Sequence, residues 1–220
     1  MNFPRLISIT TFIILTLLLV SSAGPLEKRH GFGLRLGMWN QVTDNRTEVG
    51  IGGVTTSTEA SGFFGGVFYD HWLQENLALN IAVGGMLADV ETKTDITGVS
   101  TETAFVAPIL FGVKYYFPGS TLNSSVRPLV KVAVGPFIGQ QEKTEEGVSG
   151  VIVESRSLTA FGGQVGAGVD FILSRYFMLG VALGYNLMAD FDEPIGGSKN
   201  YSGPEFSVGL SFLFGKGTDL

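Results

Sequence analysis

The segment from Phe177 to Leu187, FMLGVALGYNL, alternates between two kinds of residue along its whole length. The odd positions are bulky, whereas the even positions are mostly small and include Gly180, Ala182 and Gly184. A period of two places the two sets on opposite faces of a β-strand. In a soluble sheet the second face would be polar, but small residues suit the crowded interior of a narrow closed barrel. A strand of about ten residues with large apolar side chains outward is long enough to cross a lipid bilayer.

The composition agrees with strands that cross a membrane. The 220 residues have a positive mean hydropathy and include 31 glycines, yet after residue 23 no apolar run reaches the length of a spanning helix. In a barrel, apolar residues occupy alternate positions and never form a continuous run. The chain is long enough for one domain of moderate size.

The N-terminus has the organisation of a secretory signal peptide. Arg5 provides a positive charge, residues 12–20 (FIILTLLLV) form an apolar core, and Ser21 and Ala23 are small residues at the −3 and −1 positions. We therefore expect cleavage after Ala23, because the apolar run is too short to anchor the chain. The expected domains are a signal peptide at 1–23, a short periplasmic segment at 24–30, a barrel at 31–215 and a tail at 216–220.

The chain contains no cysteine, which excludes both a disulfide framework and a lipid-modified N-terminal cysteine. After cleavage, 13 basic and 20 acidic residues remain, without a basic stripe. This balance argues against nucleic acid as a partner.

Seven further segments resemble the one at 177–187, so the prediction is an all-β fold with eight strands. The expected strands are 31–40, 63–73, 77–90, 103–117, 126–140, 157–173, 177–187 and 205–214. Short connections (74–76, 118–125 and 174–175) alternate with long polar loops (41–60, 89–103, 141–156 and 190–202). Short turns on one side and long loops on the other are typical of an antiparallel up-and-down transmembrane β-barrel. Pro108, Pro128 and Pro136 fall inside expected strands, where we expect bulges or strand ends.

The chain resembles the small eight-stranded outer-membrane β-barrel family, which includes OmpA-like, OmpX-like and OmpW-like proteins. The resemblance depends on the hairpin from Phe68 to Leu79, on Arg127-Pro128-Leu129, and on the final strand from Phe206 to Phe214. It implies a bacterial outer-membrane location and recognition of the C-terminal strand by the barrel-assembly machinery. The chain departs from the family signal because residues 215–220 follow Phe214.

With the apolar face outward, several polar residues must point into the barrel. The expected interior network consists of Arg35, Asp70, Lys114, Arg127, Lys131, Asp170 and Gln164. Its structural interpretation is a set of ion pairs and hydrogen bonds that fill the lumen; its functional interpretation is a polar gate in a small channel. Aromatic residues gather near one end of the strands and predict a periplasmic girdle: Phe32, Tyr69, Tyr115, Phe117, Phe171, Phe177, Phe212 and Phe214.

The two histidines argue against catalysis. A lipid-modifying barrel is similar in architecture but needs a histidine near a serine and a carboxylate at the outer leaflet. His30 precedes the first strand and His71 faces outward near a periplasmic turn, where it is expected to join Trp72 in the interfacial belt. We expect no catalytic site and no cofactor.

The four long loops carry a net charge of −9, against +2 for the rest of the mature chain. Solvated loops explain this imbalance; a sharper hypothesis is an acidic mouth that collects cations or bridges them to lipopolysaccharide. Residues 190–193 (DFDE) are the best Ca²⁺ candidate, but their spacing matches no known ligand loop, so we expect no metal site.

The predicted function is therefore a structural or surface-interaction role with a largely plugged lumen. The expected partners are the bilayer and its lipopolysaccharide, and an extracellular ligand or host partner through the acidic loops. The alternative is a narrow pore or a conduit for small hydrophobic ligands of the OmpW-like type, and a lipid-modifying enzyme comes third.

Overall fold

The structure, a computed structural model, describes residue 26 and residues 28–40, 55–58, 62–95, 98–117, 125–147 and 150–215. The expected signal peptide and the C-terminal tail at 216–220 lie outside these described residues. Within the described part, no helix is long and apolar enough to cross a membrane.

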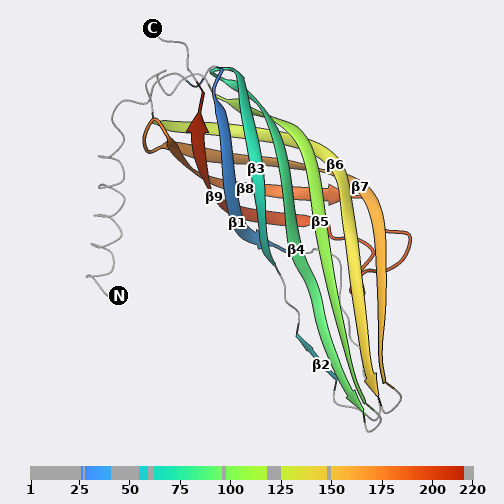
Figure 1. Cartoon of the computed structure of the whole chain (residues 1–220). Coiled ribbons are helices and arrows are strands. Elements are labelled where there is room, and N and C mark those ends of the chain that lie inside the picture. The colour runs from blue at the N-terminus through green and yellow to red at the C-terminus, as the bar shows by residue number, and fades with distance from the viewer. Residues whose placement is uncertain are drawn as a thin grey trace, which may run out of the picture.

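Eight antiparallel strands close into a barrel, as the sequence predicted (Figure 1). They are β1 (His30–Trp39), β3 (Phe63–Gln74), β4 (Leu77–Asp95), β5 (Gly98–Tyr116), β6 (Val126–Gly147), β7 (Gly150–Ile172), β8 (Phe177–Met188) and β9 (Gly203–Phe214). Each strand pairs with its neighbours in the chain, and β1 closes the ring by pairing with both β3 and β9. The short connections after β3, β5 and β7 lie at the end where β1 begins and β9 ends.

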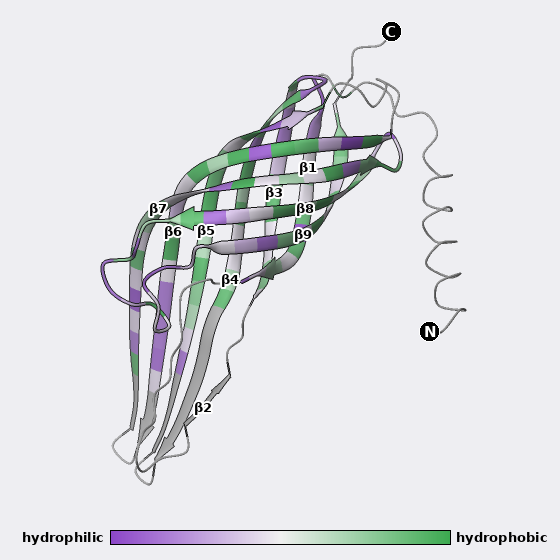
Figure 2. Cartoon of the chain, turned by 180° about the vertical axis from the view of Figure 1, so that it is seen from behind, coloured by the Kyte–Doolittle hydropathy of each residue, from purple (hydrophilic) through white to green (hydrophobic). Residues whose placement is uncertain are grey.

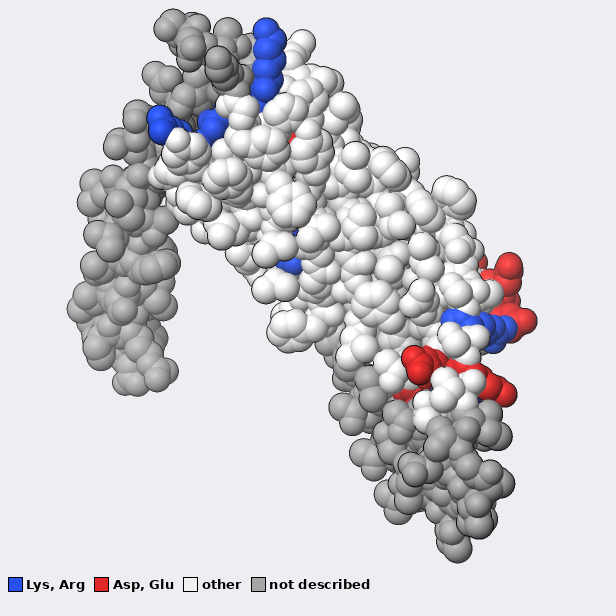
Figure 3. All heavy atoms as spheres, in the orientation of Figure 1, with Lys and Arg blue, Asp and Glu red and all other residues white. Residues whose placement is uncertain are grey.

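The alternation in the sequence sets the two faces of this ring. In β9, for example, Phe206, Val208 and Leu210 are exposed on the outside, whereas Ser207 and Ser211 are buried inside. Hydrophobic residues follow the ring portions of the strands (Figure 2), and charged residues gather near the two ends and leave the middle of the visible face almost uncharged (Figure 3). An uncharged apolar belt around a closed barrel is the surface that a bilayer requires.

Four adjacent strands, β4 to β7, extend well beyond the ring at the end opposite the short turns (Figure 1). This corrects two of the expected loops: 89–103 and 141–156 are mostly strand, since β4 pairs with β5 up to Asp95 and Gly98, and β6 pairs with β7 up to Gly147 and Gly150. These segments are polar but rich in threonine and valine, which favour strands. Outside a bilayer a strand needs no apolar face, so polarity alone does not indicate a loop.

The projecting sheet has two different edges. On one side, a short strand that the sequence had not predicted, β2 (Thr55–Thr58), pairs with β4 from Val90 to Lys93. On the other side, β8 pairs with β7 only from Gly162 onward. Among the described strands, none pairs with this edge of β7 between Gly150 and Phe161.

The expectation of bulges or strand ends at the prolines is wrong. β6 pairs with β7 in unbroken register through Pro128 and Pro136, and the β5–β6 register is the same on both sides of Pro108. The register shifts lie elsewhere, between Trp72 and Gln74 and between Leu87 and Asp89, although two positions at or next to Pro108 are unpaired in each ladder of β5. Proline removes only one donor, and its carbonyl still accepts: Phe117 N donates to Pro128 O at 3.1 Å.

The interior contains two apolar layers that the sequence analysis did not anticipate. One closes the end with the short turns: Leu26, Trp72, Ala78, Tyr116, Leu129, Ile172, Met178 and Leu213. The other lies in the opposite half of the lumen around Trp39, Phe64, Met86, Leu110 and Phe137. Trp72 is completely buried, so the expectation that it joins the interfacial belt is wrong. In a strand it alternates with His71 and must face the other side.

Candidate functional site

A polar layer crosses the lumen between the two apolar layers. The predicted interior residues Arg35, Asp70, Lys114, Arg127, Lys131, Asp170 and Gln164 are all buried, with 9% or less of their surface exposed. They come from β1, β3, β5, β6 and β7, because each occupies an inward position of its strand. The structure does not bring all seven together, and they divide into separate groups.

Asp70 is the centre of the first group. Lys114 Nζ donates to Asp70 Oδ2 at 2.6 Å, and Asn80 Nδ2 donates to Asp70 Oδ1 at 2.6 Å. Lys114 Nζ also lies 4.8 Å from the centre of the Phe68 ring. Both oxygens of the Asp70 carboxylate thus have a donor, as a fully buried charge requires.

Glu205 is the centre of a second group, and the sequence analysis missed it. Its carboxylate accepts from Gln164 Nε2 and, at 2.9 Å, from Asn186 Nδ2. Its other oxygen lies 3.6 Å from Arg35 Nη1. Glu205, Ser207 and Ser211 occupy alternate positions of β9 and face the same side. The alternation that placed the other residues inside the barrel therefore predicts that Glu205 also lies inside.

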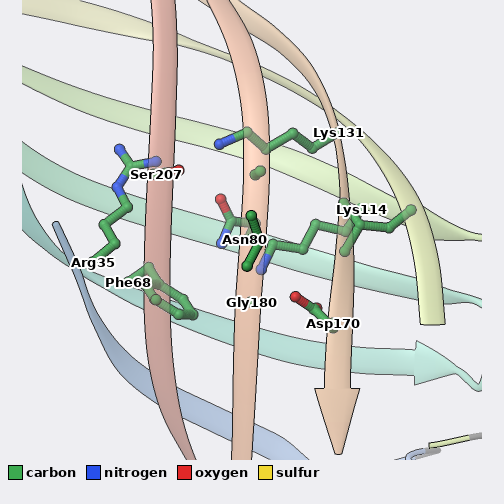
Figure 4. Close-up of a pocket in the computed structure, with 12 residues that line it drawn as sticks. Arg35, Phe68, Asn80, Lys114, Lys131, Asp170, Gly180 and Ser207 are labelled. Atoms are coloured by element: carbon green, nitrogen blue, oxygen red, sulfur yellow. The ribbon is translucent and has the colours of Figure 1, made fainter. Parts of the chain in front are cut away.

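Two predicted residues have partners outside these groups. Asp170 accepts from Tyr116 OH at 2.8 Å, at the boundary with the apolar layer near the short turns. Arg127 pairs with Glu75 of the β3–β4 turn at 2.7 Å, which ties the start of β6 to that turn. Lys131 lines the same central chamber as Arg35, Lys114 and Asp170 (Figure 4).

The connection between β8 and β9, residues 189–202, folds back over the lumen as a cap. Phe191, Ile195 and Tyr201 are buried in the apolar layer beside Trp39 and Phe137. Trp39 Nε1 donates to Tyr201 O at 2.9 Å, and Tyr201 OH donates to Ile195 O. This cap was expected to be a solvated acidic loop, but its apolar residues are buried inside the barrel end.

Polar contacts fasten the rim of the cap to the projecting strands. Gly196 N donates to Gln141 Oε1 of β6 at 3.3 Å, and Glu193 forms an exposed ion pair with Arg156 of β7. Gly139 of β6 leaves room for the cap, because a Cβ atom there would lie 2.9 Å from Ile195 Cγ1 and 3.0 Å from Phe191 Cζ.

The predicted girdle residues lie on the outer surface at the end with the short turns. Phe32, Tyr115, Phe117, Phe177, Phe212 and Phe214 are exposed, and Tyr69 and Phe171 are partly exposed. Several contact one another: Phe212 packs against Phe177, Phe214 and Tyr176, and Tyr115 packs against Phe117. Tyr176 was missed, although it lies between Arg175 and Phe177.

The two histidines meet on this same outer surface. The rings of His30 and His71 are stacked with centroids 4.6 Å apart, and His30 Nδ1 lies 2.6 Å from Tyr69 OH. The ring of Phe214 also stacks on that of His30, with the two centroids 5.4 Å apart. His71 Nδ1 is buried without a hydrogen-bond partner among the described atoms.

No cluster of three or more histidine, aspartate or glutamate side chains in the described part of the chain could hold a metal ion. The Ca²⁺ candidate at 190–193 is divided by the fold. Phe191 points into the lumen, Glu193 pairs with Arg156, and Asp190 accepts from Asn200 Nδ2 at 2.7 Å.

Solved structures with a similar fold are small outer-membrane proteins of low sequence identity. OprG from Pseudomonas aeruginosa is 11% identical, with 86% of this chain and 97% of that chain covered and a TM-score of 0.44. Ail, the attachment invasion locus protein of Yersinia pestis, is 10% identical, with 86% and 99% covered and a TM-score of 0.44. Outer membrane protein W from E. coli is 16% identical, with 83% and 97% covered and a TM-score of 0.40.

A search of curated proteins finds no match to this sequence. The family model described as "Outer membrane protein beta-barrel domain", however, matches residues 12–214, which is nearly the whole chain. Together with the closed eight-stranded barrel and its apolar outer belt, this match places the protein in the bacterial outer membrane. The chain belongs to the outer membrane protein beta-barrel domain family.

Proposed function

We propose that the protein is a closed barrel that serves as a membrane anchor for the projecting sheet of β4 to β7, which interacts with partners at the cell surface. The observation that carries this proposal is the contrast between the two parts of the molecule. Buried apolar residues form two layers inside the ring, with buried polar residues between them, whereas four strands extend past the ring (Figure 1).

The open edge of β7 is the part of this sheet best suited to bind a partner. Between Gly150 and Ala160 no described strand pairs with this edge of β7, whereas β2 covers the opposite edge. An unpaired strand edge offers N–H and C=O groups to an extended polypeptide. Glu154, Arg156 and Ser157 are exposed along it and would provide polar selectivity.

Shortening the β6–β7 hairpin tests this role. Glu142 pairs with Ser155 across the hairpin, so deleting 143–154 and joining the strands with Asn-Gly keeps the register. Bacteria that display the shortened protein should lose adhesion to one another and to cultured epithelial cells. Unchanged heat-modifiable gel migration would verify the barrel; equal adhesion by both proteins would contradict the proposal.

Conductance tests the closed lumen separately. Refolded protein in a planar bilayer should give no steady resolved openings, because side chains fill the lumen at three levels. Steady openings would contradict the plugged barrel and favour a narrow pore.

A second candidate function is the entry of small hydrophobic ligands through the mouth. It is favoured by one observation: the apolar layer at the mouth is partly built from the cap residues Phe191, Ile195 and Tyr201. An apolar ligand could take their place at little cost, because one apolar contact would replace another. Brominated alkanes should then quench the fluorescence of Trp39 in a W72F variant; quenching equal to that of a water-soluble bromide control would contradict this candidate.

A further inference from the structure

A small chamber lies in the polar layer, with a volume of about 50 Å³. Its lining includes Arg35, Asn80, Lys114, Lys131, Asp170 and Ser207 (Figure 4). A space of this size and polarity accommodates a few water molecules or one small ion. The charges around it decide which of these it favours.

Acids and bases are unevenly distributed around the chamber. On one side, Lys114 pairs with Asp70, and the carboxylate of Asp170 is held by Tyr116. This side therefore has two carboxylates and one ammonium. On the other side, Arg35 pairs with Glu205 at 3.6 Å, which leaves Lys131 as a second cation beside a single carboxylate.

Lys131 is the charged chamber residue without a direct partner among the described residues. It is 8% exposed, and it forms no hydrogen bond or ion pair with any residue in the described part of the chain. Figure 4 shows its amine directed across the lumen toward Ser207, with the Arg35 guanidinium beyond. An ammonium buried without a partner is costly, because it loses its hydration and gains no hydrogen bond in return.

Another donor near this position is also unused. Arg35 Nε is buried without a hydrogen-bond partner among the described atoms, and Ser207 lines the same chamber. Glycines make room for the two long cations: a Cβ atom at Gly166 would lie 3.1 Å from Lys131 Cε, and one at Gly84 would lie 3.9 Å from Arg35 Nη2. The chain thus keeps space and an unpaired donor beside Lys131.

We propose that the chamber binds one small inorganic monoanion of the halide class, held between Lys131 Nζ and the Arg35 guanidinium with the Ser207 hydroxyl as a third donor. The anion gives Lys131 the direct, charge-assisted hydrogen bond that no carboxylate of the layer makes with it. Asp170 faces the same chamber and repels an anion, which restricts the site to the end near Arg35. The small volume excludes large organic anions, so the selectivity is for size as well as for charge.

The test compares chloride with gluconate, an anion too large for the chamber. The protein is refolded in detergent micelles in either sodium salt at equal ionic strength, because a closed lumen must take up the anion during folding. Ligand that binds only the folded state raises the unfolding midpoint. The wild-type midpoint, read from heat-modifiable gel migration, should be several degrees higher in chloride.

K131M is the decisive variant, since it keeps an unbranched apolar stem and removes the cation. Its midpoint should be the same in the two salts, whereas K199M, which changes an exposed lysine of the cap, should retain the full chloride effect. Chloride dependence that persists in K131M would overturn the proposal, because it would place the anion elsewhere.

Anomalous diffraction from wild-type crystals grown in bromide keeps the proposal testable if K131M does not fold. A bromide peak in contact with Lys131 Nζ and Arg35 would support the site. A lumen without such a peak, or a peak only at the protein surface, would overturn it and identify the chamber as a water-filled space.

Discussion

Lys114 Nζ lies 2.6 Å from Asp70 Oδ2 in the middle of the barrel, and Asp70 has no exposed surface. The two residues belong to β5 and β3, which are not adjacent strands, so the ion pair spans the lumen side of β4. Asn80 of β4 completes the contact by donating to the other Asp70 oxygen. This pair therefore joins three strands from inside the ring.

Replacing Lys114 with methionine should destabilise the barrel strongly. The substitution leaves the Asp70 carboxylate buried without its counter-charge, and breaking a buried pair in this way costs about 3–5 kcal/mol. Urea unfolding of protein refolded into lipid vesicles measures the loss in unfolding free energy.

A double-mutant cycle provides the control for this pair. The K114M substitution should cost much less in a D70N background, because asparagine leaves no unpaired charge. If K114M costs the same amount in both backgrounds, the two side chains do not stabilise each other.

Alternation in the sequence was sufficient to place side chains inside or outside, but not to pair them. It assigned Asp70 and Lys114 to the lumen because parity depends only on the strand. Their contact depends on the stagger of β3, β4 and β5, which is a property of the closed ring. For the same reason, alternation predicts that Glu205 lies inside the barrel, but it does not predict its contact with Arg35 on the adjacent strand β1.

Hydrophobicity was a poorer guide where the environment changes along a strand. The expected loops at 89–103 and 141–156 were polar, and strand pairing continues through them because no lipid surrounds the projecting sheet. Conversely, Phe64 and Trp72 were not expected in the lumen, since large apolar residues suit either lipid or a packed interior.

Replacing Gly139 with valine should detach the cap. The added side chain would occupy the space of Ile195 and Phe191, and overpacking of this kind costs about 1–3 kcal/mol unless the neighbours move. Because the cap is an exposed connection, moving it is the easier response. Acrylamide quenching of Trp39, which is 1% exposed, should therefore increase in a W72F background.

Gly65 offers the matched control for that substitution. A Cβ atom there would lie 3.2 Å from Leu36 Cδ2, the flexible end of an exposed side chain. G65A should leave Trp39 quenching unchanged. Equal quenching in G139V and wild type would mean that the cap does not rest on Gly139.

Trp72 should stabilise the barrel through packing and not through a hydrogen bond. Its side chain is completely buried, but its Nε1 has no partner among the described atoms. W72A should thus cost about 3–5 kcal/mol in unfolding free energy and W72F about 1.5 kcal/mol. Equal losses for the two variants, measured by urea unfolding followed by circular dichroism, would reveal a hydrogen bond that matters.

The ion pair between Arg156 and Glu193 should control the position of the cap while contributing little to global stability. Both side chains are exposed, and exposed pairs contribute about 0–1 kcal/mol. R156A should therefore leave the unfolding midpoint almost unchanged but raise acrylamide quenching of Trp39, and high salt should produce the same rise in wild type by screening the pair. The charge-swapped variant R156E/E193R should return quenching to the wild-type value, because it restores attraction with the signs reversed. Quenching that stays high in the swapped variant would show that the cap is held by its apolar residues alone.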